Sequence, residues 1–145
     1  MPILLTNASP AKAPDLIDFL QKVNLPTSDL PTDLSGFTLA FDGEQIVGSA
    51  GMELLGKRGL LRSVAVAETH RNQHLGQRLF AAALDYARSH QVQEVFLITN
   101  TAERYFAKNG FQQVDRTDVP DEIAQTEQFS ALCPSTAVVM KMDLN

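Results

Sequence analysis

Residues 71–76 (RNQHLG) form a short polar turn between two apolar segments, and their types and position suit an anion site. Residues 60–66 (LLRSVAV) are aliphatic and β-branched without strict alternation, which predicts a strand buried on both faces. Beyond the turn, Leu75, Leu79 and Ala83 recur at helical spacing, which predicts an amphipathic helix. The turn therefore opens a helix whose first backbone amides lack intrahelical partners, and the helix dipole favours negative charge there.

The charges around this turn support the same interpretation. The chain has a net charge of −5, yet five basic residues and one acidic residue, Glu68, lie between positions 57 and 78. The next acidic residue is Asp85, so the first turn of the predicted helix holds no carboxylate that would compete with a ligand's charge. Charge alone equally allows a solvated basic turn. The basic residues are Lys57, Arg58, Arg62, Arg71 and Arg78.

The turn and the strand before it resemble the coenzyme A signature of the GNAT superfamily of N-acetyltransferases, Gln/Arg-x-x-Gly-x-Gly/Ala after a strand. The sequence departs from this pattern at His74, where the first glycine usually stands. If the turn has ordinary φ and ψ angles, the histidine side chain can point outward and could contact phosphate. The resemblance implies that backbone groups of the strand bind the acetyl-pantetheine arm and that the turn holds the pyrophosphate. The coenzyme residues it implies are Val64, Ala65, Val66, Arg71, Asn72, Gln73, His74, Leu75, Gly76 and Gln77.

A second block, residues 99–111 (TNTAERYFAKNGF), resembles the family segment Asn-x-x-Ala-x-x-x-Tyr-x-x-x-Gly-Phe, whose helix lies along the pantetheine. Counting back from Gly110, Phe106 falls at the tyrosine position and Thr99 at the asparagine position. Tyr105 is about 100° round the helix from Phe106, so we expect it to face elsewhere. The resemblance adds Thr99, Asn100 and Phe106 to the coenzyme residues.

The remaining elements agree with this family. We expect strands over residues 3–6, 37–41, 45–55, 94–98, 111–114 and 137–144, and helices over 15–23, 101–109 and 118–128. An Asp-Gly pair at 42–43 predicts a tight hairpin turn. The order matches the GNAT topology, so the resemblance implies an α/β fold with a mixed, mostly antiparallel central sheet flanked by helices, the GNAT acyl-CoA N-acyltransferase fold. We expect it as a single domain over residues 1–145.

The composition excludes several classes of protein. With 145 residues, 44% hydrophobic and 20% charged, the chain is predicted to be globular. It shows no apolar run of membrane-spanning length and no signal-peptide core, which predicts a cytoplasmic protein without a membrane partner. The acidic balance argues against nucleic acid as the main partner. Its one cysteine, Cys133, rules out an internal disulfide and is predicted to be buried, and no metal-ligand spacing is present.

The catalytic groups are less clear in the sequence. Glu53 is the candidate base, directly or through water; the alternative is a solvent-facing strand carboxylate. Arg62 could hold a substrate carboxylate beside Ser63, or it could form a cross-strand pair with Glu53. Phe106 has no proton to give to a leaving thiolate. A thiol ionises near ~8.5 and an alkyl amine near ~10, so deprotonating the amine is the larger task and a missing acid need not abolish activity.

These features predict an acetyl-CoA-dependent N-acetyltransferase that acts on a small primary amine by direct transfer in a ternary complex, without a metal. A further resemblance, to small GNAT proteins associated with arsenic-resistance operons, implies an amino-acid-like acceptor, a toxic analogue or an arsenical. It rests on residues 61–64, 99–102, 110–111 and 130–135. The alternatives are an acetyl-CoA-binding regulatory module and a peptide or protein N-acetyltransferase. A homodimer is left open.

Overall fold

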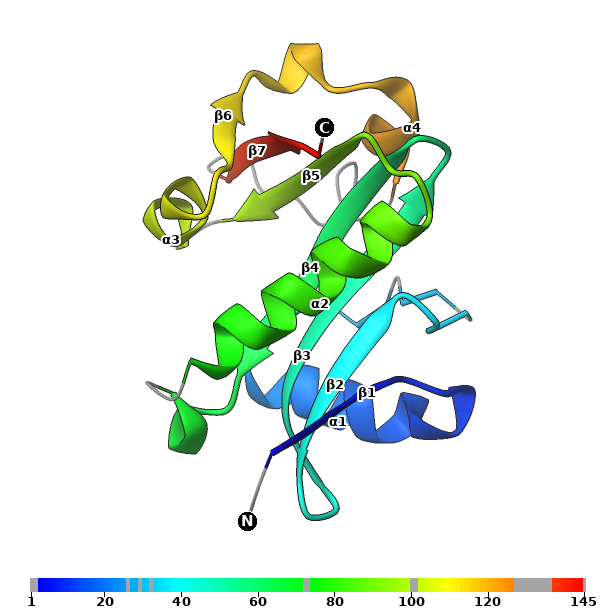
Figure 1. The fold of residues 1–145 in the computed structure, drawn as a ribbon, viewed down its shortest axis with the longest axis vertical. Helices are drawn as coiled ribbons and strands as arrows, with labels where there is room; N and C mark the ends of the chain where they lie inside the picture. The colour runs from blue at the N-terminus through cyan, green and yellow to red at the C-terminus, as the bar shows by residue number, and fades with distance from the viewer. Residues whose placement is uncertain are drawn as a thin grey trace.

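The computed structural model describes residues 3–25, 27–28, 30–31, 33–71, 74–99, 102–126 and 137–144. Within them one seven-stranded sheet has the order β1-β2-β3-β4-β5-β7-β6 (Figure 1). The strands are β1 (Leu4–Asn7), β2 (Phe37–Asp42), β3 (Gln45–Leu55), β4 (Arg58–Val66), β5 (Glu94–Thr99), β6 (Gln112–Val114) and β7 (Val138–Asp143). The helices are α1 (Ala13–Lys22), α2 (Leu75–Ser89), α3 (Glu103–Lys108) and α4 (Asp121–Ala124), with 3-10 turns η1 (Pro10–Lys12), η2 (Glu68–His70) and η3 (Arg116–Asp118).

The predicted fold class and element order are confirmed. Among the described strands, every pair is antiparallel except β4 with β5, which run parallel. The helix expected over residues 118–128 is shorter than predicted, because Pro120 holds an extended conformation and α4 covers four residues after it. Residues 127 and 128 lie outside the described part.

Helices cover both faces of the sheet. Figure 1 shows α2 crossing one face, with α1 behind the sheet on the other. The alternation of β2 explains this arrangement: Leu39 and Phe41 pack in the cluster of α1, whereas Ala40 packs in the cluster of α2. Each face of the strand therefore meets its own helix.

The same division continues through the second half of the sheet. Val95 and Leu97 of β5 lie in the cluster that contains α2 and Phe106 of α3. Phe96 points to the other face, where it packs with Ile123 of α4. None of the helices in the described ranges is long and apolar enough to cross a membrane.

Candidate active site

The two central parallel strands pair over only a short stretch. Arg58, Gly59 and Leu60 of β4 are opposite Glu94, Val95 and Phe96 of β5, and in the described part of the chain this ladder continues no further. Beyond it, β4 stays paired with β3 up to Val66, and β5 stays paired with β7 up to Thr99. The facing edges of β4 and β5 are thus separated, and we call this opening the split. The first half of β4 is buried as predicted, but from Ser63 onward it is only half-buried.

A β-bulge at Ser63 redirects β4 at the start of the split. Ser49 and Gly51 of β3 pair with Ala65 and Arg62, so two residues of β4 face one residue of β3. Ser63 has a left-handed φ of 55°, a conformation that usually favours glycine. The buried Ser49 hydroxyl donates a hydrogen bond of 2.6 Å to the Ser63 carbonyl, and Arg62 Nε donates to Ser63 Oγ at 3.2 Å. Sequence reasoning missed Ser49, since a strand serine carries no signal of its own.

The bulge also sets which side of the sheet each residue of β4 meets. Leu61, Val64 and Val66 belong to the cluster of α2, whereas Ala65 belongs to the cluster of α1. Val64 and Val66, two of the predicted coenzyme residues, therefore lie on the α2 side.

The N-terminus of α2 opens at the end of β4. It has no side-chain cap and no acidic residue in its first turn, whereas α1 has Asp15 in its first turn. His74 precedes α2 with φ 60° and ψ 16°, so the condition of an ordinary backbone is not met: the histidine adopts the left-handed conformation that glycine normally supplies. His74 and Gln77 are exposed, and Leu75 is buried in the core. Asn72 and Gln73 lie outside the described residues.

Gly76 in the first turn of α2 faces α3 across a narrow gap. A Cβ built on Gly76 would lie 3.6 Å from the Tyr105 hydroxyl and 3.8 Å from Val66 Cγ2. Tyr105 does not share the place of Phe106 in the core, as expected from its position on the helix, and its hydroxyl reaches Gly76. Its hydroxyl oxygen is buried without a hydrogen-bond partner among the described residues. Burial raises the pKa of the Tyr105 phenol above its usual value, so the phenol keeps its proton.

Phe106, which counting placed at the family's tyrosine position, packs in the core. It is 7% exposed, and its ring centroid lies 6.2 Å from that of Phe80 and 5.7 Å from that of Phe111. A coenzyme contact through Phe106 stays a prediction. Thr99 ends β5, and its hydroxyl accepts a hydrogen bond of 3.0 Å from the amide of Ala102, the residue that precedes α3. Asn100 and Cys133 lie outside the described residues.

Glu53 and Arg62 form the cross-strand pair that was one of the two alternatives for them. Arg62 Nη1 lies 2.6 Å from Glu53 Oε1, and the exposed fractions of the two side chains are 2% and 20%. The pair sits where β4 turns into its bulge, next to Ser63. Catalytic and substrate-binding roles for these residues stay predictions.

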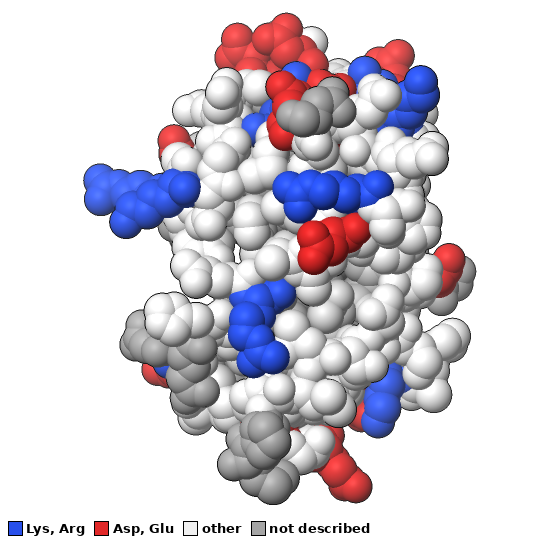
Figure 2. Space-filling model, viewed as in Figure 1, with Lys and Arg blue, Asp and Glu red and all other residues white. Residues whose placement is uncertain are grey.

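The five basic residues between positions 57 and 78 do not gather at the turn. Arg58 lies at the far end of β4, where it contacts Glu94 at 3.0 Å and Glu122 at 2.9 Å. Arg62 is held by Glu53. Figure 2 shows that the Lys and Arg side chains on the α2 face stand apart from one another. Exposed Arg71 and Arg78 remain near the turn, and Arg71 Nε donates to the Val66 carbonyl at 3.3 Å.

The segment that joins β4 to the turn is fixed by a histidine. His70 Nε2 lies 2.9 Å from Asp42 Oδ2, and His70 Nδ1 lies 2.7 Å from Thr69 Oγ1. With a side chain that is 16% exposed, His70 is more enclosed than an ordinary surface residue. It ties η2, and with it the start of the turn, to the β2–β3 hairpin.

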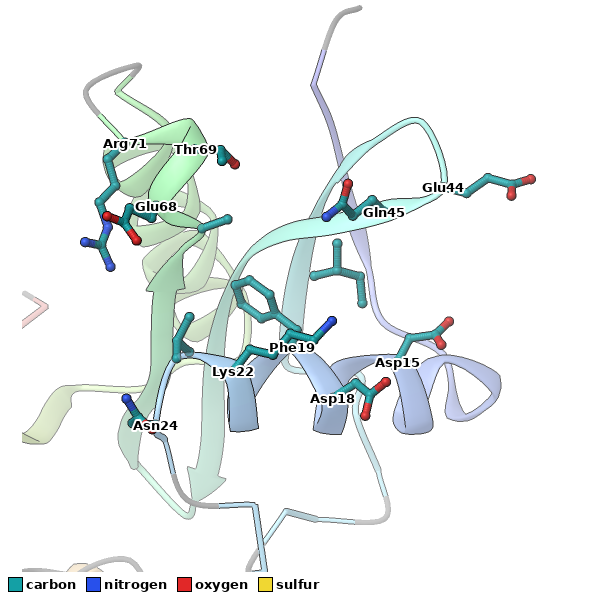
Figure 3. A pocket seen from close by; sticks show the side chains of 13 residues that line it. Asp15, Asp18, Phe19, Lys22, Asn24, Glu44, Gln45, Glu68, Thr69 and Arg71 are labelled. Carbon is teal, nitrogen blue, oxygen red and sulfur yellow. The ribbon is translucent and has the colours of Figure 1, made fainter.

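A groove of about 580 Å³ lies between α1, the β2–β3 hairpin and the segment after β4 (Figure 3). Its charged lining holds two cations, Lys22 and Arg71, and the four carboxylates of Asp15, Asp18, Glu44 and Glu68. This excess of acidic groups does not suit a pyrophosphate. The groove therefore does not replace the α2 N-terminus as the anion site. In the described ranges no three His, Cys, Asp or Glu side chains could together hold a metal ion.

The chain that folds into this site matches a known family. A family model described as "Acetyltransferase (GNAT) family" covers residues 8–111, well over half of the chain. The chain belongs to this family. A solved structure of a GNAT-family acetyltransferase from Staphylococcus aureus aligns with a TM-score of 0.81 at 19% identity, over 99% of this chain and 100% of that one.

Two further relatives are longer than this chain. An amino-acid acetyltransferase from Mycobacterium tuberculosis is 30% identical over 92 residues, which are 63% of this chain and 49% of that protein. N-acetylglutamate synthase from Neisseria gonorrhoeae, solved with coenzyme A and N-acetyl-glutamate, aligns with a TM-score of 0.84 at 16% identity, over 100% of this chain and 36% of that one. The chain thus spans about half of the first relative and about a third of the second. The structural likeness concerns the fold.

Proposed function

We propose that this chain is an acetyl-CoA-dependent N-acetyltransferase that acts on a small, amino-acid-like primary amine by direct transfer. The observation that carries the proposal is the split between β4 and β5, which ends at the uncapped N-terminus of α2. Membership of the GNAT family supports the reaction class. The relatives support the cosubstrate and an amino-acid acceptor, because one is an amino-acid acetyltransferase and another was solved with coenzyme A.

The residues at the split fit coenzyme A. The free edge of β4 offers backbone groups to an extended arm, and the first amides of α2 suit the pyrophosphate. Gly76 adds no side chain to the first turn of α2, where a Cβ would meet the Tyr105 hydroxyl and Val66 at ordinary contact distances. The coenzyme would supply an acetyl group activated as a thioester. In this proposal Val64, Ala65 and Val66 orient the arm, while Arg71 and His74 contribute positive charge or hydrogen bonds at the turn.

Glu53 is the group proposed to take a proton from the acceptor amine. It is partly exposed and ends up beside the bulge, while Arg62 holds one of its oxygens. Because Arg62 is almost fully buried and lies 2.6 Å from Glu53, we assign it to positioning Glu53; holding a substrate carboxylate would require Glu53 to move aside. An arsenical or other toxic amino-acid analogue is a finer proposal that rests on the sequence resemblance alone.

The test is release of free coenzyme A thiol from acetyl-CoA, with and without a panel of primary amines. The panel contains amino acids, glutamate analogues with phosphorus or arsenic, polyamines and peptides. We expect release that depends on an amino-acid-like acceptor. Thiol release with peptides only would mean that the acceptor is a protein or peptide rather than a small molecule. No thiol release with any amine of the panel would contradict the proposal that the protein is an N-acetyltransferase.

Gly76→Glu is the matched negative control for this assay. It adds bulk and negative charge at the proposed pyrophosphate site, so the affinity for coenzyme A should fall more than about tenfold, the effect of 1.4 kcal/mol. Gly76→Ala separates the two effects, since its Cβ makes only ordinary contacts and the helix gains about 1 kcal/mol of propensity. If a folded Gly76→Glu protein bound coenzyme A with unchanged affinity, the pyrophosphate could not bind at the α2 N-terminus.

A regulatory module that binds acetyl-CoA without turnover is the second candidate. It is favoured by Phe106, which lies in the core and has no proton to give, and by the engagement of Glu53 with Arg62. Tight binding of acetyl-CoA together with silence in the thiol assay would support this candidate. Turnover with any amine would exclude it.

A further inference from the structure

We propose that Tyr105 is a coenzyme-binding residue whose hydroxyl donates a hydrogen bond to an oxygen of coenzyme A beside Gly76, where the pantothenate arm joins the pyrophosphate. The inference rests on the proposed function. The Tyr105 hydroxyl oxygen is buried and has no hydrogen-bond partner in the described part of the chain. A buried polar atom without a hydrogen bond is costly, by about 1–3 kcal/mol, and such atoms are rare in folded proteins.

The position of the hydroxyl identifies the ligand it could serve. Its neighbours are Gly76 in the first turn of α2 and Val66 at the end of β4, two of the positions that the sequence assigns to coenzyme binding. Both flank the end of the split that is closer to the α2 N-terminus. Ser63 and the Arg62–Glu53 pair lie further back along β4, so the hydroxyl is placed for the coenzyme arm rather than for the reacting amine.

The direction of the hydrogen bond follows from the chemistry of the phenol. Burial keeps the Tyr105 proton in place, so the hydroxyl is available as a donor. Its partner must then be an acceptor. Pantothenate and pyrophosphate are rich in carbonyl, hydroxyl and phosphate oxygens. The ring itself is held by the neighbouring side chain, since Tyr105 and Phe106 meet edge to face with centroids 5.2 Å apart.

This assignment separates two adjacent aromatic residues of α3. Phe106 turns into the core between Phe80 and Phe111, while the Tyr105 hydroxyl lies beside Gly76 at the start of α2. The hydroxyl therefore contributes to coenzyme affinity and not to the departure of the thiolate.

Titration of coenzyme A against wild type and Tyr105→Phe, followed by calorimetry, tests the proposal. Loss of one hydrogen bond should weaken binding about three- to tenfold. Without coenzyme, the variant should unfold at the same temperature as wild type or higher, because it loses a hydroxyl that has no partner. The Michaelis constant for acetyl-CoA should rise by the same factor, with an unchanged turnover number. Tyr86→Phe is the matched control, since its hydroxyl lies 3.3 Å from Ser35 Oγ instead, and it should leave coenzyme affinity unchanged.

Two results would overturn the proposal while leaving the proposed function standing. One is unchanged coenzyme affinity in Tyr105→Phe, and the other is a lower turnover number at an unchanged Michaelis constant. A wild-type protein that binds no coenzyme A at all would overturn both this proposal and the proposed function.

Discussion

The Ser49 hydroxyl donates a hydrogen bond of 2.6 Å to the carbonyl oxygen of Ser63, and this contact holds the bulge of β4 from the neighbouring strand. Ser49 is fully buried, and Ser63 has a left-handed φ. The bond therefore offsets part of the strain of a residue other than glycine in that conformation. The bend at the mouth of the split depends on two residues 14 positions apart in the chain.

Ser49→Ala should destabilise the protein by about 1–2 kcal/mol, because the Ser63 carbonyl loses its donor in a buried setting. Chemical denaturation measures this change. Ser89→Ala is the control, since that serine also donates to a carbonyl, that of Tyr86, but is exposed and lies at the C-terminal end of α2. Equal, small effects of the two substitutions would show that the bulge is stable without Ser49.

Phe106→Tyr should destabilise the protein by about 1–3 kcal/mol without raising turnover, because the new hydroxyl would enter the aromatic core. Thermal unfolding and the thiol-release assay measure the two quantities. A faster enzyme of unchanged stability would mean that the side chain reaches the coenzyme after all.

Glu53→Gln should lower the turnover number about 100-fold or more if Glu53 is the base. It should also destabilise the fold by about 3 kcal/mol, because Arg62 is buried and loses its charged partner. The double variant Glu53→Gln with Arg62→Met separates these effects: stability should recover while activity stays low. Recovery of both would make the pair structural and would move the base elsewhere.

Stability should fall when the pH drops below the ordinary range of glutamate. Lys141, at 2.6 Å, and then Arg58 lower the pKa of Glu94 from its usual 4.5. The contribution is complete above pH 4.5 and is lost as the pH falls through the lower folded value. Glu94→Gln should remove this acid dependence and cost up to about 1 kcal/mol at neutral pH. Denaturation at a series of pH values from 7 to 3 gives the free energy of unfolding of both proteins. If this free energy fell equally with pH in wild type and Glu94→Gln, Glu94 would not be a source of the acid dependence.

Local sequence patterns predicted the fold well, because hydrophobic period and turn residues act over short distances. The Asp-Gly pair predicted the β2–β3 hairpin, and the spacing of Leu75, Leu79 and Ala83 predicted α2. The misjudged features depend on distant partners. Arg58 pairs with Glu122 on α4, 64 residues away in the sequence. The basic residues between positions 57 and 78 are therefore not all available at the turn.

The orientation of α3 also depends on a distant partner. Counting from Gly110 fixed the spacing along the helix but not its rotation, which is set by the packing of Phe106 against Phe80 of α2. Neither the bulge nor the start of α2 carries a glycine that the sequence could reveal, since Ser63 at the bulge and His74 before α2 both hold left-handed conformations.

Ser63 is also the one residue that a regular β4 could lose. Removing a residue from an ordinary strand turns every later side chain to the opposite side. In β4 the bulge already adds one residue, so a deletion of Ser63 would restore regular alternation without reversing it. Leu61, Val64 and Val66 would still face α2, and Arg62 and Ala65 would still face away. The bend of β4 at the split therefore depends on the extra residue of the bulge, and not on which side chains of β4 pack in the core. Deleting that one residue could straighten β4 while each core side chain stays on its own face of the sheet.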